Sequence, residues 1–413
     1  MGGSHTGSDE EISDAIILEN SSNPENFELE HLENTLETAT LATEFSGNSD
    51  SEHENSDFDE DTITDLPNFT LLNGFHKRTY KSGAWYEGSW LNGKKHETGV
   101  YHWPSGDCYM GEWNLNKKHG KGKYIFHTGD EFEGDFNWGK RTGFGVVKYL
   151  DGGSYEGGWL NDKKHGKGKF LFVDGSYYNG EWKNDLKHGF GTESFVNGDK
   201  FEGEFLNGEK HGKGRMEKSG GYPFYDGFYI NGLRNGYGEY FMTEKCFYNG
   251  NYLNGKKCGH GDQKYENGCV YSGDWENGKR QGKGKFIWAK GEQIDRDSEE
   301  SDYYEGEWVD GDRNGQGEHN YSNGDVYKGE WSSGVKNGNG EYRYANGDVF
   351  NGVFFNGVKT GFGVKKYSKG GEFKGNWIAN RKNGFGEMIY ETGQRYRGEW
   401  KSDTAEFVKP VSS

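Results

Sequence analysis

One pattern recurs along most of the chain: an aromatic residue, Gly two positions later, and a second aromatic residue two positions after that. Successive copies are 23 residues apart, except for one step of 24 and one of 33. A fixed period of this length is typical of repeat architectures, in which each unit packs only on its neighbours. The fourteen copies begin at Tyr86, Tyr109, Phe132, Tyr155, Tyr178, Phe201, Tyr225, Tyr248, Tyr271, Tyr304, Tyr327, Phe350, Phe373 and Tyr396.

Each unit predicts one β-hairpin. Residues two and four positions apart on a strand share a face, so both aromatic side chains and the Gly between them point the same way. We expect the Gly to leave a slot that an aromatic ring of a neighbouring strand fills. A turn such as residues 208–212 follows, and then a second strand with an aromatic face, as at Phe170 and Phe172. A closing turn such as Asp174-Gly175 leads into the next unit.

The array therefore predicts an all-β fold: an elongated, twisted, single antiparallel sheet of stacked hairpins. It covers residues 74–403, with thirteen full units, a half unit at each end and an insertion at 292–302. Residues 404–413 are expected to be a C-terminal tail. At ~4.8 Å per strand, two strands per unit give a length on the order of 120 Å.

The opposite face of the predicted sheet carries charge of both signs. Acids such as Glu156 and Glu181 flank the first-strand Gly, and bases such as Lys169 and Arg215 occupy the second strand. Cross-strand pairs at exposed sites contribute a few tenths of a kcal/mol each. We interpret this face as a solvated surface rather than a binding patch.

Composition limits what else the chain can be. Hydrophobic residues make up only 31% but aromatic residues reach 16%, so a core must be built mainly from rings. No run of 18 apolar residues predicts a membrane-spanning helix, and no secretory signal is evident. The four Cys give no disulfide framework, which favours a reducing, intracellular compartment.

The negative charge is concentrated at the N-terminus. Residues 1–70 hold 19 acids and no Lys or Arg, whereas the remainder is nearly balanced, so no basic footprint for nucleic acid exists. Residues 1–73 predict an acidic, mostly disordered tail. Leucines at helical spacing could form a short helix at 27–43 on docking, and a coil with incidental leucines is the alternative. Ser8, Ser49 and Ser51 precede acids, the context that an acidophilic kinase recognises.

The first residues match the pattern for N-myristoylation, with Gly2 as the modified residue and Thr6 in the required place. A single myristoyl chain anchors a protein only marginally, and an acidic tail is repelled by anionic lipid. Lipidation at Gly2 is therefore kept as an alternative.

We find no enzyme, cofactor or metal signature. A His recurs at the same position of five units, His96, His119, His165, His188 and His211, but one hairpin separates neighbouring copies by roughly 9–10 Å, too far to share a metal ion. Gly-x-Gly pairs lead into strands rather than helices, so the helix N-terminus of a phosphate loop is missing. We expect these His to hydrogen-bond the hairpin end.

The consensus Tyr-x-Gly-x-Trp-x-x-Gly-x-x-His-Gly-x-Gly resembles the MORN repeat. Residues 155–168 and 178–191 show it apart from Asp162 and Asp185, which replace the Gly three residues after Trp, and residues 201–214 keep that Gly as Gly208. The His is replaced by Thr142 in one early unit and by other residue types in all full units from Asn235 onward.

The resemblance implies scaffolding. Similar arrays occur in radial spoke head proteins of cilia, in cytoskeletal organisers at membranes, and joined to kinase or methyltransferase domains. We expect no such domain here, because the stretches outside the repeats, such as residues 1–73, are too short and too polar to form one.

We therefore expect a non-enzymatic scaffold of a ciliary or flagellar axoneme, in the cytoplasm at the cytoskeleton, that resembles a radial spoke head component. Its partners are expected to be other structural proteins, with homodimerisation left open. The alternative is a membrane-associated tether that binds acidic phospholipid or is anchored at Gly2. The predicted partner-binding groove consists of Tyr86, Trp90, Tyr109, Trp113, Tyr155, Trp159, Tyr178, Trp182, Tyr271, Trp275, Tyr304, Trp308, Tyr327 and Trp331.

Overall fold

A computed structural model describes residues 72–219, 223–289 and 302–411. The predicted helix at 27–43, the candidate lipidation site Gly2 and the three candidate phosphorylation sites lie outside these residues, as does most of the insertion at 292–302. Every regular element in the described ranges is a β-strand, which confirms the all-β prediction.

The strands alternate in length, the first strand of a typical unit having 7 residues and the second 9. The first fifteen are β1 (Gly74–Thr79), β2 (Trp85–Leu91), β3 (Lys94–His102), β4 (Cys108–Asn114), β5 (Lys117–Ile125), β6 (Glu131–Asn137), β7 (Lys140–Lys148), β8 (Ser154–Leu160), β9 (Lys163–Leu171), β10 (Tyr177–Lys183), β11 (Leu186–Ser194), β12 (Lys200–Leu206), β13 (Glu209–Glu217), β14 (Pro223–Ile230) and β15 (Leu233–Phe241). The others are β16 (Phe247–Leu253), β17 (Lys256–Lys264), β18 (Val270–Glu276), β19 (Lys279–Ile287), β20 (Tyr303–Val309), β21 (Asp312–Asn320), β22 (Val326–Ser332), β23 (Val335–Arg343), β24 (Val349–Phe355), β25 (Val358–Lys366), β26 (Gly371–Ile378), β27 (Arg381–Tyr390), β28 (Arg395–Lys401) and β29 (Thr404–Pro410).

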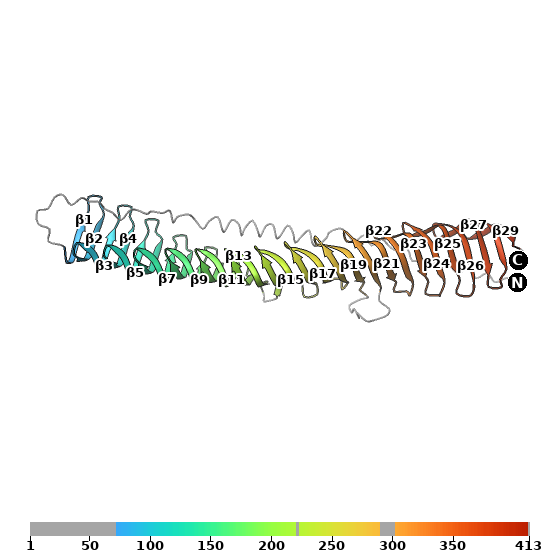
Figure 1. Cartoon of the computed structure of the whole chain (residues 1–413), viewed down its shortest axis with the longest axis horizontal. Helices are drawn as coiled ribbons and strands as arrows, with labels where there is room; N and C mark the ends of the chain where they lie inside the picture. The colour runs from blue at the N-terminus through green and yellow to red at the C-terminus, as the bar shows by residue number, and fades with distance from the viewer. Residues whose placement is uncertain (1–71, 220–222, 290–301, 412–413) are drawn as a thin grey trace. The chain divides into compact units, whose positions relative to one another are not determined.

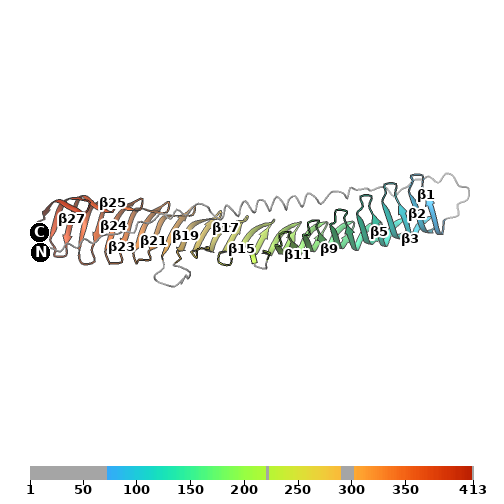
Figure 2. The ribbon, with the colours of Figure 1, turned by 180° about the vertical axis from the view of Figure 1, so that it is seen from behind.

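All 29 strands form one open antiparallel sheet, as predicted. Each strand pairs with the strands before and after it in sequence, so the sheet is a continuous meander. Figures 1 and 2 show the strands following one another along the twisted sheet from β1 to β29. Residues 404–410, which we expected to be part of a tail, form β29 because they complete the hairpin of the last half unit.

The first turn of each hairpin is tighter than predicted. In the unit that begins at Phe201, Leu206 pairs with Glu209, so the turn contains only Asn207 and Gly208, both with positive φ (52° and 97°). This is the geometry of a two-residue hairpin turn. The predicted turn at 208–212 is therefore wrong in extent, since residues 209–212 belong to β13.

The glycine that suggested a longer turn lies in a β-bulge. Gly212 has a φ of +65°, and the register between β12 and β13 shifts beside it, between Gly203 and Phe205. A bulge of this kind needs a residue with positive φ, which Gly adopts without steric cost. The Glu204 carboxylate accepts a hydrogen bond from the Lys213 backbone N–H (3.2 Å) across the bulge. Four equivalent contacts recur: Glu112 with Lys121, Asp135 with Phe144, Asp274 with Lys283 and Glu330 with Asn339.

Register assigns side chains to the two faces of the sheet. Phe201 lies opposite Met216, Gly203 opposite Gly214 and Phe205 opposite Lys210. Directly opposed residues of paired strands share a face. We call this the aromatic face; it carries the residues at 0, 2, 4, 9, 13, 15 and 17 positions after the first aromatic residue of each unit.

The other face, which we call the charged face, has the predicted ion pairs. Lys285 Nζ lies 3.9 Å from the Glu305 carboxylate and Lys121 Nζ lies 2.6 Å from that of Asp135. These acids have a second role where they cap a bulge, as Asp135 does for the Phe144 backbone N–H (3.0 Å).

Closing turns are linked from one unit to the next by aspartates. Asp107 accepts a hydrogen bond from the backbone N–H of His127 (2.7 Å), one unit further along the sheet. The same contact recurs for Asp130 with Leu150, Asp199 with Ser219, Asp325 with Ala345 and Asp348 with Ser368. These carboxylates therefore connect adjacent units along the edge of the sheet.

Candidate binding face

The first aromatic ring of each unit lies on a pair of glycines. Tyr178 is fully buried, and a Cβ placed on Gly191 would lie 2.5 Å from its hydroxyl oxygen and 2.6–2.7 Å from ring carbons. Gly180 is directly opposite Gly191, so one ring covers both. We predicted that a ring from a neighbouring strand would fill the slot. That prediction is wrong: two opposed glycines leave a hollow wide enough for the ring two residues earlier on the same strand.

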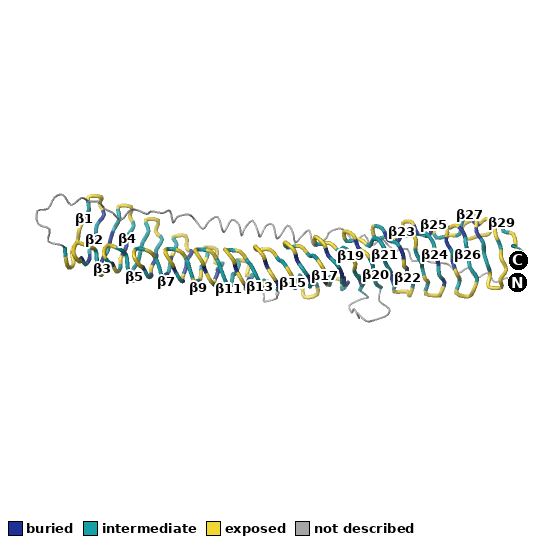
Figure 3. The backbone as a smooth tube through the Cα atoms, viewed as in Figure 1, coloured by how far each residue is buried: buried dark blue, intermediate teal, exposed yellow. Residues whose placement is uncertain are grey.

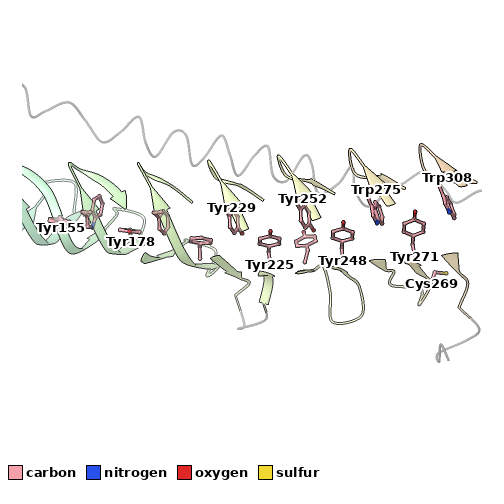
Figure 4. Packing of buried hydrophobic residues seen from close by; sticks show 14 of the residues in the cluster. Tyr155, Tyr178, Tyr225, Tyr229, Tyr248, Tyr252, Cys269, Tyr271, Trp275 and Trp308 are labelled. Carbon is pink, nitrogen blue, oxygen red and sulfur yellow. The ribbon is translucent and has the colours of Figure 1, made fainter. Parts of the chain in front are cut away.

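Each buried ring is held between two others. The Tyr178 ring meets Trp182 of its own unit edge to face (centroids 5.1 Å apart, planes at 88°) and Phe205 of the next unit (5.0 Å, 83°). Such edge-to-face pairs contribute about 0.5–1.5 kcal/mol beyond area burial. Figure 4 shows the resulting two rows, one with Tyr225, Tyr248 and Tyr271 and the other with Tyr229, Tyr252, Trp275 and Trp308.

Tryptophan side chains also connect units by hydrogen bonds. Trp182 Nε1 donates to the Gly168 carbonyl of the preceding unit (3.0 Å). Trp113, Trp159, Trp275, Trp308, Trp331 and Trp377 make the same contact at 3.0–3.3 Å. The core of the sheet is thus a continuous double row of rings in which every unit completes the burial of its neighbours.

The fourteen residues of the predicted groove all belong to this double row. Each is at most 6% exposed, and the Tyr rings are fully buried. Trp90 and Trp113, two residues of that groove, flank the Tyr86 ring, with ring centroids 5.1 Å and 5.5 Å from it. The structure brings all these residues together as a core. Partner binding by them stays a prediction, and a partner would first meet the side chains beside them.

Those neighbouring side chains form a second row of rings that solvent reaches. They lie 17 positions after the first aromatic residue, near the closing turn, and are half-buried. Figure 3 shows that exposed residues gather at the turns along both edges of the sheet, with buried and intermediate residues on the strands between them. We call them the accessible aromatic row: Trp103, Phe126, Tyr149, Phe172, Phe195, Tyr265, Trp288, Tyr321, Tyr344 and Tyr367. The sequence predicts an aromatic face on the second strand, but it does not distinguish these partly exposed rings from buried ones such as Tyr101.

A row of cations that was not predicted from the sequence runs along the aromatic face. Every full unit has Lys or Arg nine positions after its first aromatic residue, directly opposite the second aromatic residue. We call it the cation ladder: Lys95, Lys118, Arg141, Lys164, Lys187, Lys210, Arg234, Lys257, Arg280, Arg313, Lys336, Lys359 and Lys382. The regular spacing of these cations is visible in the sequence. However, the turn predicted at 208–212, and the equivalent turn of every other unit, assigned them to a loop rather than to a strand.

Ladder cations lie over aromatic rings. Lys95 Nζ is 3.9 Å from the Tyr101 ring centroid, and the Arg313 guanidinium is 4.3 Å from that of Trp331. Every ladder residue has at least one ring within 6.0 Å, the range of a cation–π contact. The rings hold the charged groups on the aromatic face while the aliphatic stems cover the core.

On the aromatic face, units differ at the position 15 residues after the first aromatic residue. It holds Tyr101 and Phe170 in early units but Glu193, His319 and Lys365 in others. Burial opposes ionisation of Glu193, but Lys187 and Lys210 beside it hold the pKa of its carboxyl below the usual range. This position therefore changes the local charge and shape of an otherwise uniform face.

His319, at this position, has polar partners at both ring nitrogens. Its Nε2 lies 2.6 Å from the Asp302 carboxylate and its Nδ1 3.1 Å from an Arg313 nitrogen. Its ring stacks between Trp288 (4.8 Å) and Tyr321 (4.0 Å).

The five repeated His were expected to hydrogen-bond the hairpin end, and in the described residues their Nδ1 atoms do not. The Nδ1 atoms of His96, His119, His165, His188 and His211 are buried and make no hydrogen bond within the described ranges, so the expected bond to the hairpin end is not made there. Among described residues, no three His, Cys, Asp or Glu side chains lie close enough to hold a metal ion. In the same residues, no helix has the length and apolar character needed to cross a bilayer.

Comparison with protein families finds one match that covers most of the chain. The MORN repeat model matches residues 86–108, 109–131, 132–154, 155–177, 178–200, 201–221, 225–242, 248–270, 271–293, 304–326, 327–349, 350–372 and 373–395. No match is found among curated proteins.

Solved structures give only distant likenesses. The SAS-4 (dCPAP) TCP domain of Drosophila melanogaster, in complex with a proline-rich motif of Ana2, is 12% identical, with 39% of this chain and 94% of that chain covered and a TM-score of 0.24. The TCP10 domain of Danio rerio CPAP, in complex with a STIL peptide, is 8% identical, with 66% and 98% covered and a TM-score of 0.18. At these TM-scores neither likeness bears on the fold or the function of this chain.

Proposed function

This chain belongs to the MORN-repeat family, a family of structural repeats rather than of enzymes, and on that basis we propose that it is a non-enzymatic scaffold that binds other proteins along its aromatic face. The observation that carries the proposal is the accessible aromatic row, because it lines the same face as the core with one half-buried ring in most units. Aromatic side chains beside a rigid core are typical anchors of protein interfaces.

The proposed setting is the axoneme of a cilium or flagellum, in an assembly similar to a radial spoke head. This part of the proposal is supported by the resemblance of the repeat to those of radial spoke head proteins. The proposed partners are structural proteins of the axoneme or cytoskeleton, and the proposed location is the cytoplasm.

Purification from native cells tests the scaffold, with bound proteins identified by mass. The variant Phe126→Ser/Tyr149→Ser/Phe172→Ser removes three rings of the accessible aromatic row. The matched control, Phe144→Ser/Phe190→Ser/Tyr237→Ser, removes three rings of the charged face that are 52%, 54% and 52% exposed. We expect the first variant to lose structural partners that the natural chain and the control retain.

Partners lost equally from both variants, or only from the control, would contradict a binding role for the aromatic face. Thermal unfolding of each variant shows whether the sheet remains intact, so loss of binding can be separated from loss of fold.

A membrane-associated tether is the second candidate, favoured by the myristoylation pattern at Gly2 and Thr6. Flotation of the chain with vesicles that contain acidic phospholipid, compared with its Gly2→Ala variant, tests it. Binding that needs Gly2 would favour a lipid anchor, and binding without it would favour direct lipid recognition. If neither the natural chain nor the Gly2→Ala variant floats with the vesicles, the tether is contradicted and the scaffold is the one remaining proposal.

A further inference from the structure

We propose that the aromatic face binds an extended acidic polypeptide segment in the polyproline II conformation, with a carboxylate at every third residue on the cation ladder. The inference rests on the proposed scaffold function and specifies the chemistry of the partner. It combines three observations: the regular spacing of the ladder, the excess of positive charge on this face, and the row of half-buried rings beside it.

Spacing sets the conformation of the bound segment. Two strands at ~4.8 Å each separate successive ladder cations by about 9.6 Å. A polyproline II helix rises ~3.1 Å per residue with three residues per turn, so every third side chain lies on the same side, about 9.3 Å from the last. A β-strand fails this test because its residues three apart point to opposite sides. The near equality of the two repeats lets one segment meet several units in register.

Charge sets the chemistry of the segment. All thirteen full units carry a ladder cation, and acids on this face and in the described closing turns beside it are fewer. Five aspartates of the closing turns, among them Asp107 and Asp348, accept a hydrogen bond from the backbone of the next closing turn, and Glu193 lies between two ladder lysines.

Ladder cations differ in how far solvent reaches them. Lys336 and Lys359 are buried, but ladder cations such as Lys95, Lys118 and Lys164 are partly exposed. The aromatic face is thus a positive stripe, and because its charged groups are held over rings, little side-chain entropy is lost when a carboxylate binds.

The accessible aromatic row accounts for the residues between the acids. Aromatic-lined surfaces bind proline-rich segments because a polyproline II helix is already ordered before binding. Rings such as Phe126 and Tyr149 recur with the same period as the ladder. A segment with Pro or small apolar residues between its acids would place them against these rings.

Nucleic acid fits the ladder poorly. Phosphates along one strand of B-form DNA follow at about 3.4 Å, roughly a third of the ladder spacing. Most phosphates would therefore lack a cation, whereas a carboxylate at every third residue leaves none unpaired.

Fluorescence anisotropy with the full chain tests the proposal. The probe is a labelled peptide of Pro-Ala-Glu repeats long enough for about eight units, and the control peptide has the same composition with its Glu residues grouped at one end. The ladder variant is Lys95→Gln/Lys118→Gln/Lys164→Gln. The matched variant, Lys148→Gln/Lys167→Gln/Lys169→Gln, changes the net charge equally at exposed positions of the charged face.

We expect the periodic peptide to bind the natural chain more tightly than the grouped peptide does. The ladder variant should raise its Kd about tenfold or more, since charge-assisted contacts are lost, and the charged-face variant about twofold at most. A Lys95→Arg/Lys118→Arg/Lys164→Arg variant should restore binding, and thermal unfolding confirms that each variant is folded.

Three results would overturn the proposal: no binding of the periodic peptide, equal loss in both glutamine variants, or tighter binding of a single-stranded DNA of similar length that the ladder variant abolishes. Failure here is distinguishable from failure of the scaffold. If the accessible-row variant loses its cellular partners while the ladder variant keeps them, the scaffold stands and the acidic segment is wrong.

Discussion

The unit that begins at Tyr178 and the half unit that begins at Tyr396 have similar first strands but different surroundings. Tyr178 is fully buried between the rings of Trp182 and Phe205. Tyr396 is only partly buried, since Val408 of β29 lies opposite Gly398 where the interior unit has a second glycine, and no further unit follows in the described sheet.

The second aromatic residue differs in the same way. Trp182 Nε1 donates to the Gly168 carbonyl, whereas the buried Trp400 Nε1 has no partner in the described residues. The ladder position opposite Trp400 is Ala405 rather than a cation. Similar strand residues thus become a well-packed core only when units on both sides complete it, as expected for a quasi-one-dimensional repeat.

The largest expected difference between the two regions comes from removing the second ring. Trp182→Ala should lower the free energy of unfolding by about 4 kcal/mol, because it opens a cavity between two units. Trp400→Ala should cost roughly half as much, since its ring has neighbours on one side. Chemical denaturation of both variants measures the difference, and equal losses would contradict the dependence on neighbouring units.

A side chain placed in the glycine hollow should act almost as strongly. Gly180→Val puts a Cβ 2.5 Å from the Gly191 Cα and from the Tyr178 hydroxyl, so we expect a loss of about 3 kcal/mol through overpacking. Asn179→Val adds the same side chain to the exposed, opposite face one residue away and should change stability by less than about 0.5 kcal/mol. If thermal unfolding of Gly180→Val matches that of Asn179→Val, the hollow is not filled.

High pH should weaken the interior units. Burial raises the pKa of Tyr225 to about 12, and it raises the pKa of Tyr178 and the other fully buried tyrosines as well. The unfolded chain ionises near pH 10, so stability is full below that pH and falls as pH rises from 10 toward 12. We expect Tm to fall across this window, and less steeply in Tyr225→Phe. A Tm independent of pH up to 12 would show that these hydroxyls are not buried.

A smaller contrast isolates the tryptophan hydrogen bond. Trp182→Phe keeps a ring but removes the contact to the Gly168 carbonyl, and should cost about 1 kcal/mol more than Trp400→Phe, in which no bond is lost. Urea titration of the two variants measures this difference. A larger loss at Trp400 would show that the end of the sheet is packed differently.

The period and the aromatic positions were enough to predict the sheet, its strand order and its aromatic side. They did not predict the two-residue turn, because Gly208 and Gly212 both have positive φ and sequence does not distinguish a turn from a bulge. Because of that error, Lys210 and the equivalent cations of other units were assigned to turns, so the cation ladder was not predicted. The packing of the Tyr178 ring on two glycines was also not predicted. It depends on Gly180 lying opposite Gly191, a register that the bulge determines.

The first aromatic ring of each full unit packs against two directly opposed glycines, and the energy of this contact can be measured. A double-mutant cycle with Tyr178→Ala and Gly191→Ala measures it, because the three atoms nearest to a Cβ on Gly191 all belong to the Tyr178 side chain. We predict that Gly191→Ala is strongly destabilising when Tyr178 is present and nearly neutral when it is absent, with a coupling energy above about 1 kcal/mol. Additive free energies of unfolding would contradict the account.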